Sequence, residues 1–226
     1  MIQTGQVQVN GRRADHPGAL IDPEADRVVY RGRQVRPPAV CTYLVLNKPA
    51  GVLVSAGDPH HERTVYDLLK GISTRVFPVG RLDLDTQGVL LLTDDGDLGH
   101  RLTHPRYGVE KTYRALVRGI PPSDALRRLR EGVAIEGGVT APANVRMART
   151  RGEDGELELT LHEGRKRQVK QMCAAVGHPV RRLERILFGG ISAKGLRPGC
   201  WRHLTGPEVD RLVRLVGLER TYAGGG

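Results

Sequence analysis

Segments typical of strands and of helices follow one another along residues 42–216 without strict alternation. A doubly wound parallel sheet requires a helix between successive strands, so this irregular order favours the α+β class. The predicted strands are residues 42–46, 89–92, 110–117, 157–162, 180–188 and 201–204. The predicted helices are residues 64–69, 123–130, 165–176 and 208–216.

Local signals support two of these helices. From Val169 onward, apolar residues recur at the i, i+3, i+4 and i+7 spacing of one helical face, and core packing explains that stripe. Gly177 then marks the end of the helix. Thr64, with Asp67 three residues later, is a capping box that opens the shorter helix.

The first 38 residues are predicted to be a small unit separate from a main domain at residues 39–226. The two prolines within residues 36–39 interrupt both helix and sheet pairing and indicate a linker. A unit as short as this one buries little apolar surface by itself.

Hairpin signals dominate that small unit. Residues 6–11 alternate between polar and apolar and end in Asn-Gly, a strong signal for a two-residue turn. Residues 27–35 predict two further short strands on either side of Arg31 and Gly32.

The motif GRLDLDTQG at residues 80–88 is the strongest candidate for chemistry. It places Asp83 and Asp85 after Arg81 on a loop that leads into a short apolar strand. Such carboxylates are either catalytic or solvated partners of the arginine, and the spacing leaves both interpretations open.

The charge of the chain favours a polyanionic partner. Its 35 Lys and Arg against 25 Asp and Glu give a net charge of +10, as is typical of proteins that bind nucleic acid. Residues 163–185 contain seven cations against two anions, beside a helix start that can attract phosphate. Aromatic residues make up only 4%, which disfavours a base-stacking platform.

Several other functional classes are excluded. The sequence has no Walker loop, no GxGxxG fingerprint and no GxSxG elbow. His100 and His104 lack the glutamate of a zinc-protease motif, and three scattered cysteines form no metal-binding pair. No apolar run approaches the length of a membrane span, and we expect a cytoplasmic protein.

Five segments resemble the bacterial ribosomal RNA pseudouridine synthases of the RsuA/RluB type. They occur in the order found in that family, and together they are highly specific. They are LNKPAGVLVS at 46–55, VGRLDLDTQGVLLLTDDGDL at 79–98, EKTYR at 110–114, EGRKRQVKQM at 163–172 and LRPGCWRHL at 196–204. The resemblance implies a catalytic domain with a mixed, mostly antiparallel sheet flanked by helices.

The N-terminal residues 5–28 resemble the later portion of the alpha-L RNA-binding module that precedes this catalytic domain. The chain begins where the second helix of that module would be ending. We therefore expect a truncated module.

The resemblance also implies roles for individual residues. Asp83 matches the catalytic aspartate, Tyr113 the tyrosine that packs on the target uracil, and Lys170 the cation that pairs with the aspartate. Arg81 matches an arginine that replaces the flipped-out base. At the position of Lys170 many relatives have arginine, whose bidentate fork is absent here.

Further positions are implied to support the site or to bind RNA. Lys48 and Pro49 match a motif regarded as structural support. The charged segment adds Arg165, Lys166 and Arg167 as expected RNA contacts.

The implied activity is the isomerisation of a uridine of ribosomal RNA to pseudouridine. The reaction involves no net redox change and no hydrolysis, so we expect neither cofactor nor metal. The expected partner is ribosomal RNA or a pre-ribosomal particle, bound by a monomer. We favour large-subunit RNA. The alternatives are small-subunit RNA and a non-catalytic RNA-binding or ribosome-assembly protein.

Overall fold

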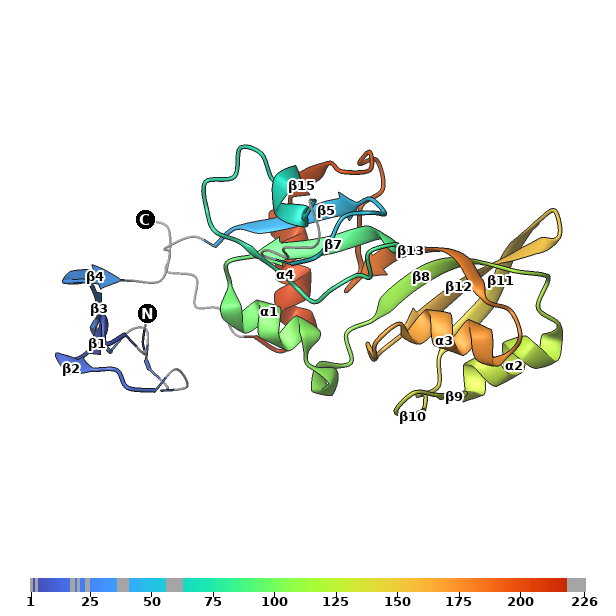
Figure 1. Cartoon of the computed structure of the whole chain (residues 1–226), viewed down its shortest axis with the longest axis horizontal. Helices are drawn as coiled ribbons and strands as arrows, with labels where there is room; N and C mark the ends of the chain where they lie inside the picture. The colour runs from blue at the N-terminus through green and yellow to red at the C-terminus, as the bar shows by residue number, and fades with distance from the viewer. Residues whose placement is uncertain are drawn as a thin grey trace. The chain divides into compact units, whose positions relative to one another are not determined.

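The chain divides into two compact units, Met1–Cys41 and Thr42–Gly226 (Figure 1). The computed structural model describes residues 2, 4–16, 19, 21–22, 25–35, 41–55 and 63–218. The linker predicted at residues 36–39 lies outside these ranges, as does the predicted boundary after residue 38.

The first unit is a small antiparallel sheet with the strand order β2-β1-β3-β4. Its strands are β1 (Val7–Val9), β2 (Arg12–Arg13), β3 (Val28–Tyr30) and β4 (Arg33–Val35). Positive φ angles at Asn10 (51°) and Gly11 (78°) form the tight turn between β1 and β2. Arg31 and Gly32, with φ angles of 49° and 78°, do the same between β3 and β4. Both predicted hairpins are confirmed.

A nine-stranded mixed sheet forms the centre of the second unit. Its order is β11-β12-β8-β13-β7-β5-β15, with β14 paired to β13 and β6 to β7. Among the described strands only β7 and β13 pair in parallel, so the expected mixed, mostly antiparallel sheet is confirmed. The strands are β5 (Tyr43–Lys48), β6 (Phe77–Pro78), β7 (Gln87–Thr93), β8 (Lys111–Val117), β11 (Asn144–Arg151), β12 (Asp154–Leu161), β13 (Val180–Phe188), β14 (Ile191–Ser192) and β15 (Trp201–His203).

Helices cover both halves of this sheet (Figure 1). In the figure α1 and α4 lie with β5, β7 and β15, whereas α2 and α3 lie with β8, β11 and β12. The helices are α1 (Gly96–Thr103), α2 (Ser123–Glu131), α3 (Gln168–Ala175) and α4 (Gly206–Leu215), with short 3-10 turns η1 (Val65–Leu68) and η2 (Pro105–Tyr107). A two-stranded hairpin, β9 (Ala134–Ile135) and β10 (Gly138–Val139), contacts α3.

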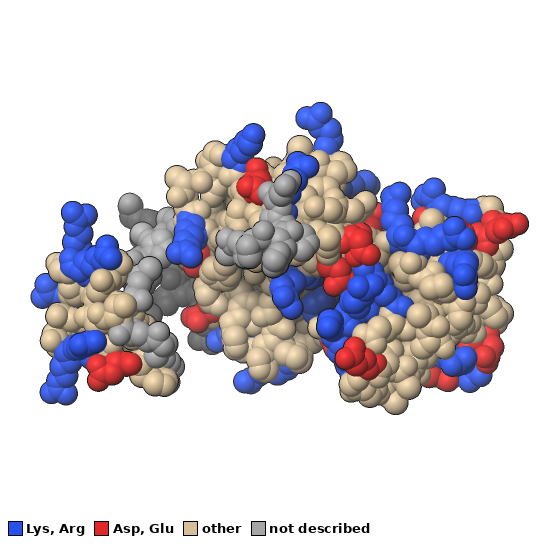
Figure 2. Space-filling view, in the orientation of Figure 1, with Lys and Arg blue, Asp and Glu red and all other residues tan. Residues whose placement is uncertain are grey.

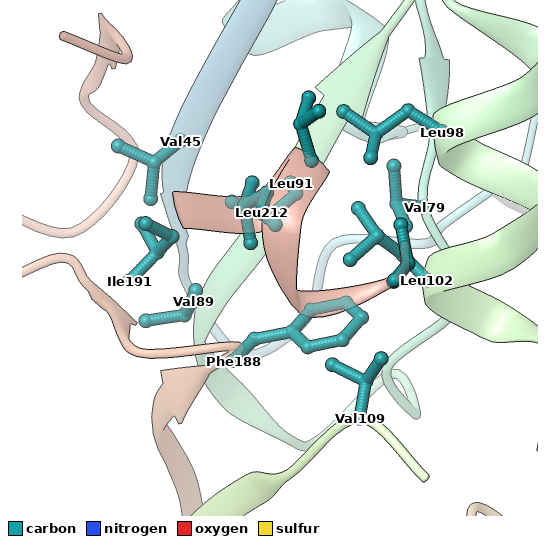
Figure 3. Packing of buried hydrophobic residues seen from close by; sticks show 12 residues of the cluster. Val45, Val79, Val89, Leu91, Leu98, Leu102, Val109, Phe188, Ile191 and Leu212 are labelled. Atoms are coloured by element: carbon teal, nitrogen blue, oxygen red, sulfur yellow. The ribbon is translucent and has the colours of Figure 1, made fainter. Parts of the chain in front are cut away.

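Strand β7 is buried on both faces, which explains its continuous apolar sequence. One face contributes Val89 and Leu91 to a core with Leu212 of α4 (Figure 3). The other face contributes Leu90 and Leu92 to a second core formed with β5 and residues 52–82. A third core lies between the β8–β12–β13 part of the sheet and helices α2 and α3.

Four elements differ from the sequence predictions. No helix was predicted after residues 89–92, but the polar run Thr93–Asp97 contains the start of α1, because the Asp95 side chain caps the helix by accepting from Leu98 N at 3.0 Å. Strand β11 was not predicted at all. Helix α3 begins at Gln168 and not at Arg165. The capping box of Thr64 is present, but it opens a 3-10 turn.

Candidate active site

The GRLDLDTQG loop leads directly into β7, and glycine shapes its end. Asp83 begins a tight turn in which Thr86 N donates to the Asp83 carbonyl at 3.1 Å. Gly88 has a φ of 103°, and a Cβ there would lie 2.2 Å from the carbonyl oxygen of Arg185 on β13. The motif therefore ends in glycine because β13 approaches the backbone at this point.

The side chain of Lys48 fixes this loop from the interior of the protein. Its side chain is fully buried, and its ammonium donates to the carbonyls of Pro49 at 3.0 Å, Leu84 at 3.2 Å and Thr86 at 2.9 Å. Gly51 N also donates to the Leu84 carbonyl at 2.8 Å. The LNKPAG segment thus holds both sides of the tight turn through backbone oxygens.

The charge of Lys48 interacts with the carboxylates of Asp83 and Asp85. Burial lowers its pKa from 10.5 to about 8, and the nearby charges of Asp85 and Asp83 oppose that shift. The positive charge of Lys170 lowers the same pKa further.

Lys170 comes from α3 and bridges both aspartates. Its Nζ lies 3.1 Å from Oδ2 of Asp83 and also donates a hydrogen bond to Oδ1 of Asp85. Its side chain is only 13% exposed, against 34% for Asp83 and 67% for Asp85. The hydrogen bond from Lys170 lowers the pKa of Asp85. The family resemblance implies an ion pair between Lys170 and Asp83, whereas in the structure Lys170 also pairs with Asp85.

The two aspartates differ in the cavities they face. Asp83 lines a narrow cavity of about 70 Å³ together with Tyr113 of β8, Arg81 and Thr86. Asp85 lines only the wider groove outside it. The structure therefore brings Asp83, Tyr113 and Arg81 to one cavity, with Lys170 bound to its carboxylate.

Tyr113 lies where two hydrophobic cores meet, since it packs against both the second and the third core. Thr86, only 2% exposed, lines the same cavity, and its hydroxyl has no hydrogen-bond partner among the described residues. Sequence reasoning did not single out Thr86.

The three expected RNA contacts of the charged segment differ in their surroundings. The Arg165 guanidinium binds Glu163 at 3.2 Å and the carbonyls of Gly137, Gly138 and Val139 at 3.0–3.3 Å, so it fixes the β9–β10 hairpin. Lys166 and Arg167 are exposed along the wider groove. Arg81 is exposed as well, and the described part of the chain supplies no hydrogen bond or ion pair to its side chain.

Arg167 also explains why α3 starts late. This residue caps the helix in a left-handed conformation with a φ of 53°, which no sequence signal indicates for an arginine. Lysines and arginines gather around the middle of the visible face of the second unit, next to acidic side chains (Figure 2).

The seven cations of residues 163–185 do not form a single surface. Arg181 pairs with Asp154 at 3.1 Å, and Arg185 is only 2% exposed. Arg185 follows Leu183 at the period of two along β13, and this alternation was the available signal for its burial.

Other reactive groups among the described residues do not form a second reactive centre. Burial raises the pKa of the Cys173 thiol to about 12, which keeps it protonated in the core. His100 and His104 lie at the end of α1, and His60 and His61 lie outside the described residues. Among the described residues no group of His, Cys, Asp or Glu is arranged to hold a metal ion. Nor do those residues form any helix long and apolar enough to cross a membrane.

The chain is similar to several known proteins. Residues 42–175, more than half of the chain, match the RNA pseudouridylate synthase family. The chain is 40% identical to the ribosomal large subunit pseudouridine synthase B of Bacillus subtilis (strain 168), over 96% of this chain and 88% of the relative. It is 36% identical to the ribosomal small subunit pseudouridine synthase A of Escherichia coli (strain K12), over 94% and 91%. A crystal structure of a pseudouridylate synthase superposes with a TM-score of 0.72 at 31% identity, covering 94% of this chain and 90% of that one.

Proposed function

Because the chain belongs to the RNA pseudouridylate synthase family, we propose that it isomerises a uridine of large-subunit ribosomal RNA with Asp83 as its catalytic residue. An RNA pseudouridine synthase breaks the bond between N1 of uracil and C1′ of the ribose, and joins C5 to C1′ instead. The proton of C5 is released and N1 gains one, so the product is an isomer of the substrate.

The position of Asp83 supports this proposal most directly. Its carboxylate faces the cavity that contains Tyr113, and Lys170 lies 3.1 Å away. The Lys170 ammonium at this distance compensates the negative charge of the carboxylate. An ionised Asp83 can attack C1′ as a nucleophile or remove a proton from the ribose as a base. Tyr113 would pack on the uracil while it rotates.

The groove outside the cavity offers the charge needed to hold RNA. Arg81, Lys166 and Arg167 line it and are exposed. Unstacking the target uridine costs a few kcal/mol, which contacts to flanking phosphates offset. In this proposal Arg81 fills the place that the base leaves.

The choice of large-subunit RNA rests on the relatives. The large-subunit enzyme of Bacillus subtilis is 40% identical, and the small-subunit enzyme of Escherichia coli is 36% identical. Mapping pseudouridine in both ribosomal RNAs of a deletion strain separates the two. Loss of a small-subunit pseudouridine alone would overturn the large-subunit assignment.

The first unit is proposed to be the later part of an alpha-L module that contacts RNA. Arg12 and Arg13 are exposed on β2, and the turn residue Arg31 lies between β3 and β4. Such side chains are suited to phosphate contacts.

Replacing Asp83 tests the catalytic assignment. Asp83→Asn should lower the rate of tritium release from ribosomal RNA labelled at C5 of uridine by at least about a thousandfold, because amide nitrogen and oxygen supply neither nucleophile nor base. Asp85→Asn is the matched control, since it removes the other partner of Lys170 but lies outside the inner cavity. Its rate should stay within about tenfold of wild type.

RNA affinity completes the test. Both variants should bind ribosomal RNA about as well as wild type. Near-normal tritium release by Asp83→Asn, or equal losses in the two variants, would contradict the assignment. A wild-type protein that binds RNA but releases no tritium would instead support the non-catalytic alternative.

A further inference from the structure

A second cavity adjoins the one that contains Asp83. It has a volume of about 170 Å³, and Arg81, Tyr113 and Arg165 line both cavities. Strands β8 and β13 form its floor, and the end of α1 lies beside it. The charged or titratable side chains that line it, apart from Tyr113, are Arg81, Lys111, His162, Glu163, Arg165 and Arg185.

Arg185 enters this cavity from the middle of the sheet. It pairs across β13 and β8 with Tyr113, so the two side chains project from the same face. Its Nε donates to the Val89 carbonyl at 2.8 Å, whereas one terminal nitrogen is buried without a hydrogen-bond partner among the described residues. A buried guanidinium with an unused donor is costly unless something else binds it.

Lys111 is the second cation. Its Nζ donates to the Val109 carbonyl at 2.9 Å and lies 5.5 Å from the centre of the Phe188 ring. The Arg185 guanidinium lies 4.8 Å from the same ring. Burial lowers the pKa of Lys111 to about 8, and the charge of Arg185 lowers it further. Phe188 itself is fixed in the core next to Val109 (Figure 3).

Neither cation has an acidic partner in the described part of the chain. Within the described residues no carboxylate forms an ion pair with Lys111 or Arg185. The one acidic residue that lines the cavity, Glu163, is bound to Arg165 at 3.2 Å and also accepts from Ala141 N at 3.1 Å. Two desolvated positive charges that repel each other require an anion to compensate them.

We propose that this cavity binds a backbone phosphate of RNA next to the target uridine. Lys111, which is partly exposed, makes the direct contact, and Arg185 beneath it adds its charge. The proposal rests on the proposed function, because an RNA placed in the Asp83 cavity would bring a phosphate to this position. A neutral uracil would leave both charges uncompensated, so the ligand is an anion.

Lysine NMR provides a direct test. The chain has six lysines, so the signal of Lys111 can be assigned from its loss in Lys111→Arg. Without ligand it should titrate near pH 8, and a bound phosphate should raise that midpoint by about one pH unit. The probes are uridine, inorganic phosphate, uridine 5′-monophosphate and uridine 3′-monophosphate.

Each probe has a defined outcome. One of the two nucleotides should shift Lys111 at about tenfold lower concentration than inorganic phosphate, because its nucleoside occupies the adjoining cavity. Uridine should leave the signal unchanged. An unresponsive Lys111, equal responses to inorganic phosphate and both nucleotides, or an equal response to uridine would overturn the proposal.

Variants link the site to RNA and separate it from catalysis. Lys111→Gln should reduce the slope of log affinity against log salt for ribosomal RNA by about 0.7 to 0.9, the effect of one lost phosphate contact. Lys70→Gln, at an exposed position away from both cavities, should not change it. Arg185→Gln should weaken the nucleotide-induced shift of Lys111. If Arg185→Gln does not fold, Lys111→Gln still tests the proposal. An unchanged slope of log affinity against log salt in Lys111→Gln would contradict it.

Asp83→Asn should show the same phosphate response as wild type. A normal response in a wild-type protein that releases no tritium would contradict only the proposed function. A normal rate of tritium release with no response would contradict only the phosphate site.

Discussion

A single lysine, Lys48, supports the loop that contains Asp83 both through hydrogen bonds and through its charge. Lys48 donates to three carbonyls of the segments that form the loop, and no other described side chain donates to Leu84 or Thr86. Because the ammonium is buried, its charged form is disfavoured in the folded protein relative to the unfolded chain. This difference makes the contribution of Lys48 to stability depend on pH.

The pH dependence has a defined sign. Between about pH 8 and 10.5 the folded state binds fewer protons at Lys48 than the unfolded state, so raising the pH favours folding. The free energy of unfolding of wild type should therefore rise relative to Lys48→Met by on the order of 3 kcal/mol over this range. Urea denaturation of both proteins at several pH values measures the difference, in which the other titrating groups cancel. A constant difference would contradict the burial of a charged Lys48.

The surroundings of several single residues could not be predicted from the sequence. The motif identified Asp83 and Asp85, but only the fold shows that Asp83 alone lines the inner cavity and that Lys170 contacts both. The burial of Arg185 was also missed, because arginine is rarely buried and its alternation with Leu183 is short.

At the scale of elements, prediction was best where local chemistry determines the conformation. The strand at residues 180–188 was predicted with its observed bounds, and the Asn10-Gly11 turn follows from turn preferences. Strand β11 was missed because its sequence, NVRMARTR, has few apolar residues and lies at the edge of the sheet. Helix α1 was missed because its cap, Asp95, is surrounded by residues that also favour turns.

The start of α3 gives a prediction that separates stability from RNA binding. Arg167 has a left-handed conformation that costs a non-glycine residue about 1 kcal/mol, and its side chain faces the groove. Arg167→Gly should therefore raise the free energy of unfolding by up to about 1 kcal/mol, while affinity for ribosomal RNA falls several-fold.

Arg167→Ala is the matched control, since it removes the charge but keeps the backbone strain. It should lose as much RNA affinity as Arg167→Gly without gaining stability. Equal stabilities in the two variants would contradict the strain, and unchanged affinity in both would contradict the RNA contact. Chemical denaturation and filter binding measure the two quantities.

At the scale of the whole molecule, the two units should differ in what they contribute. The proposed catalytic groups Asp83, Tyr113 and Lys170 all belong to the second unit, which contains all three hydrophobic cores. The first unit is four short strands with no fully buried side chain among its described residues. Family resemblance could predict this division, but neither sequence nor composition gives the affinity that each unit adds.

Removal of residues 1–41 tests this division. The remaining chain should keep a cooperative thermal transition, because its cores are complete without the first unit. Its half-saturating concentration of ribosomal RNA should rise, whereas the maximal rate of tritium release should change less than about threefold. A large loss of maximal rate with unchanged half-saturation would show that the first unit acts on the site and not on RNA capture.

The parallel pairing of β7 with β13 involves only two residue pairs, Gln87 with Glu184 and Gly88 with Arg185. The loop with Asp83 leads into one of these strands, and the helix with Lys170 precedes the other. This short parallel pairing therefore helps to set the distance between the Asp83 carboxylate and the Lys170 ammonium. A one-residue insertion in β13 before Glu184 would shift the register of β13 against β7 and misplace the Lys170 ammonium. Length changes in this strand should thus be excluded during evolution, whereas the distant β11–β12 turn is free to vary.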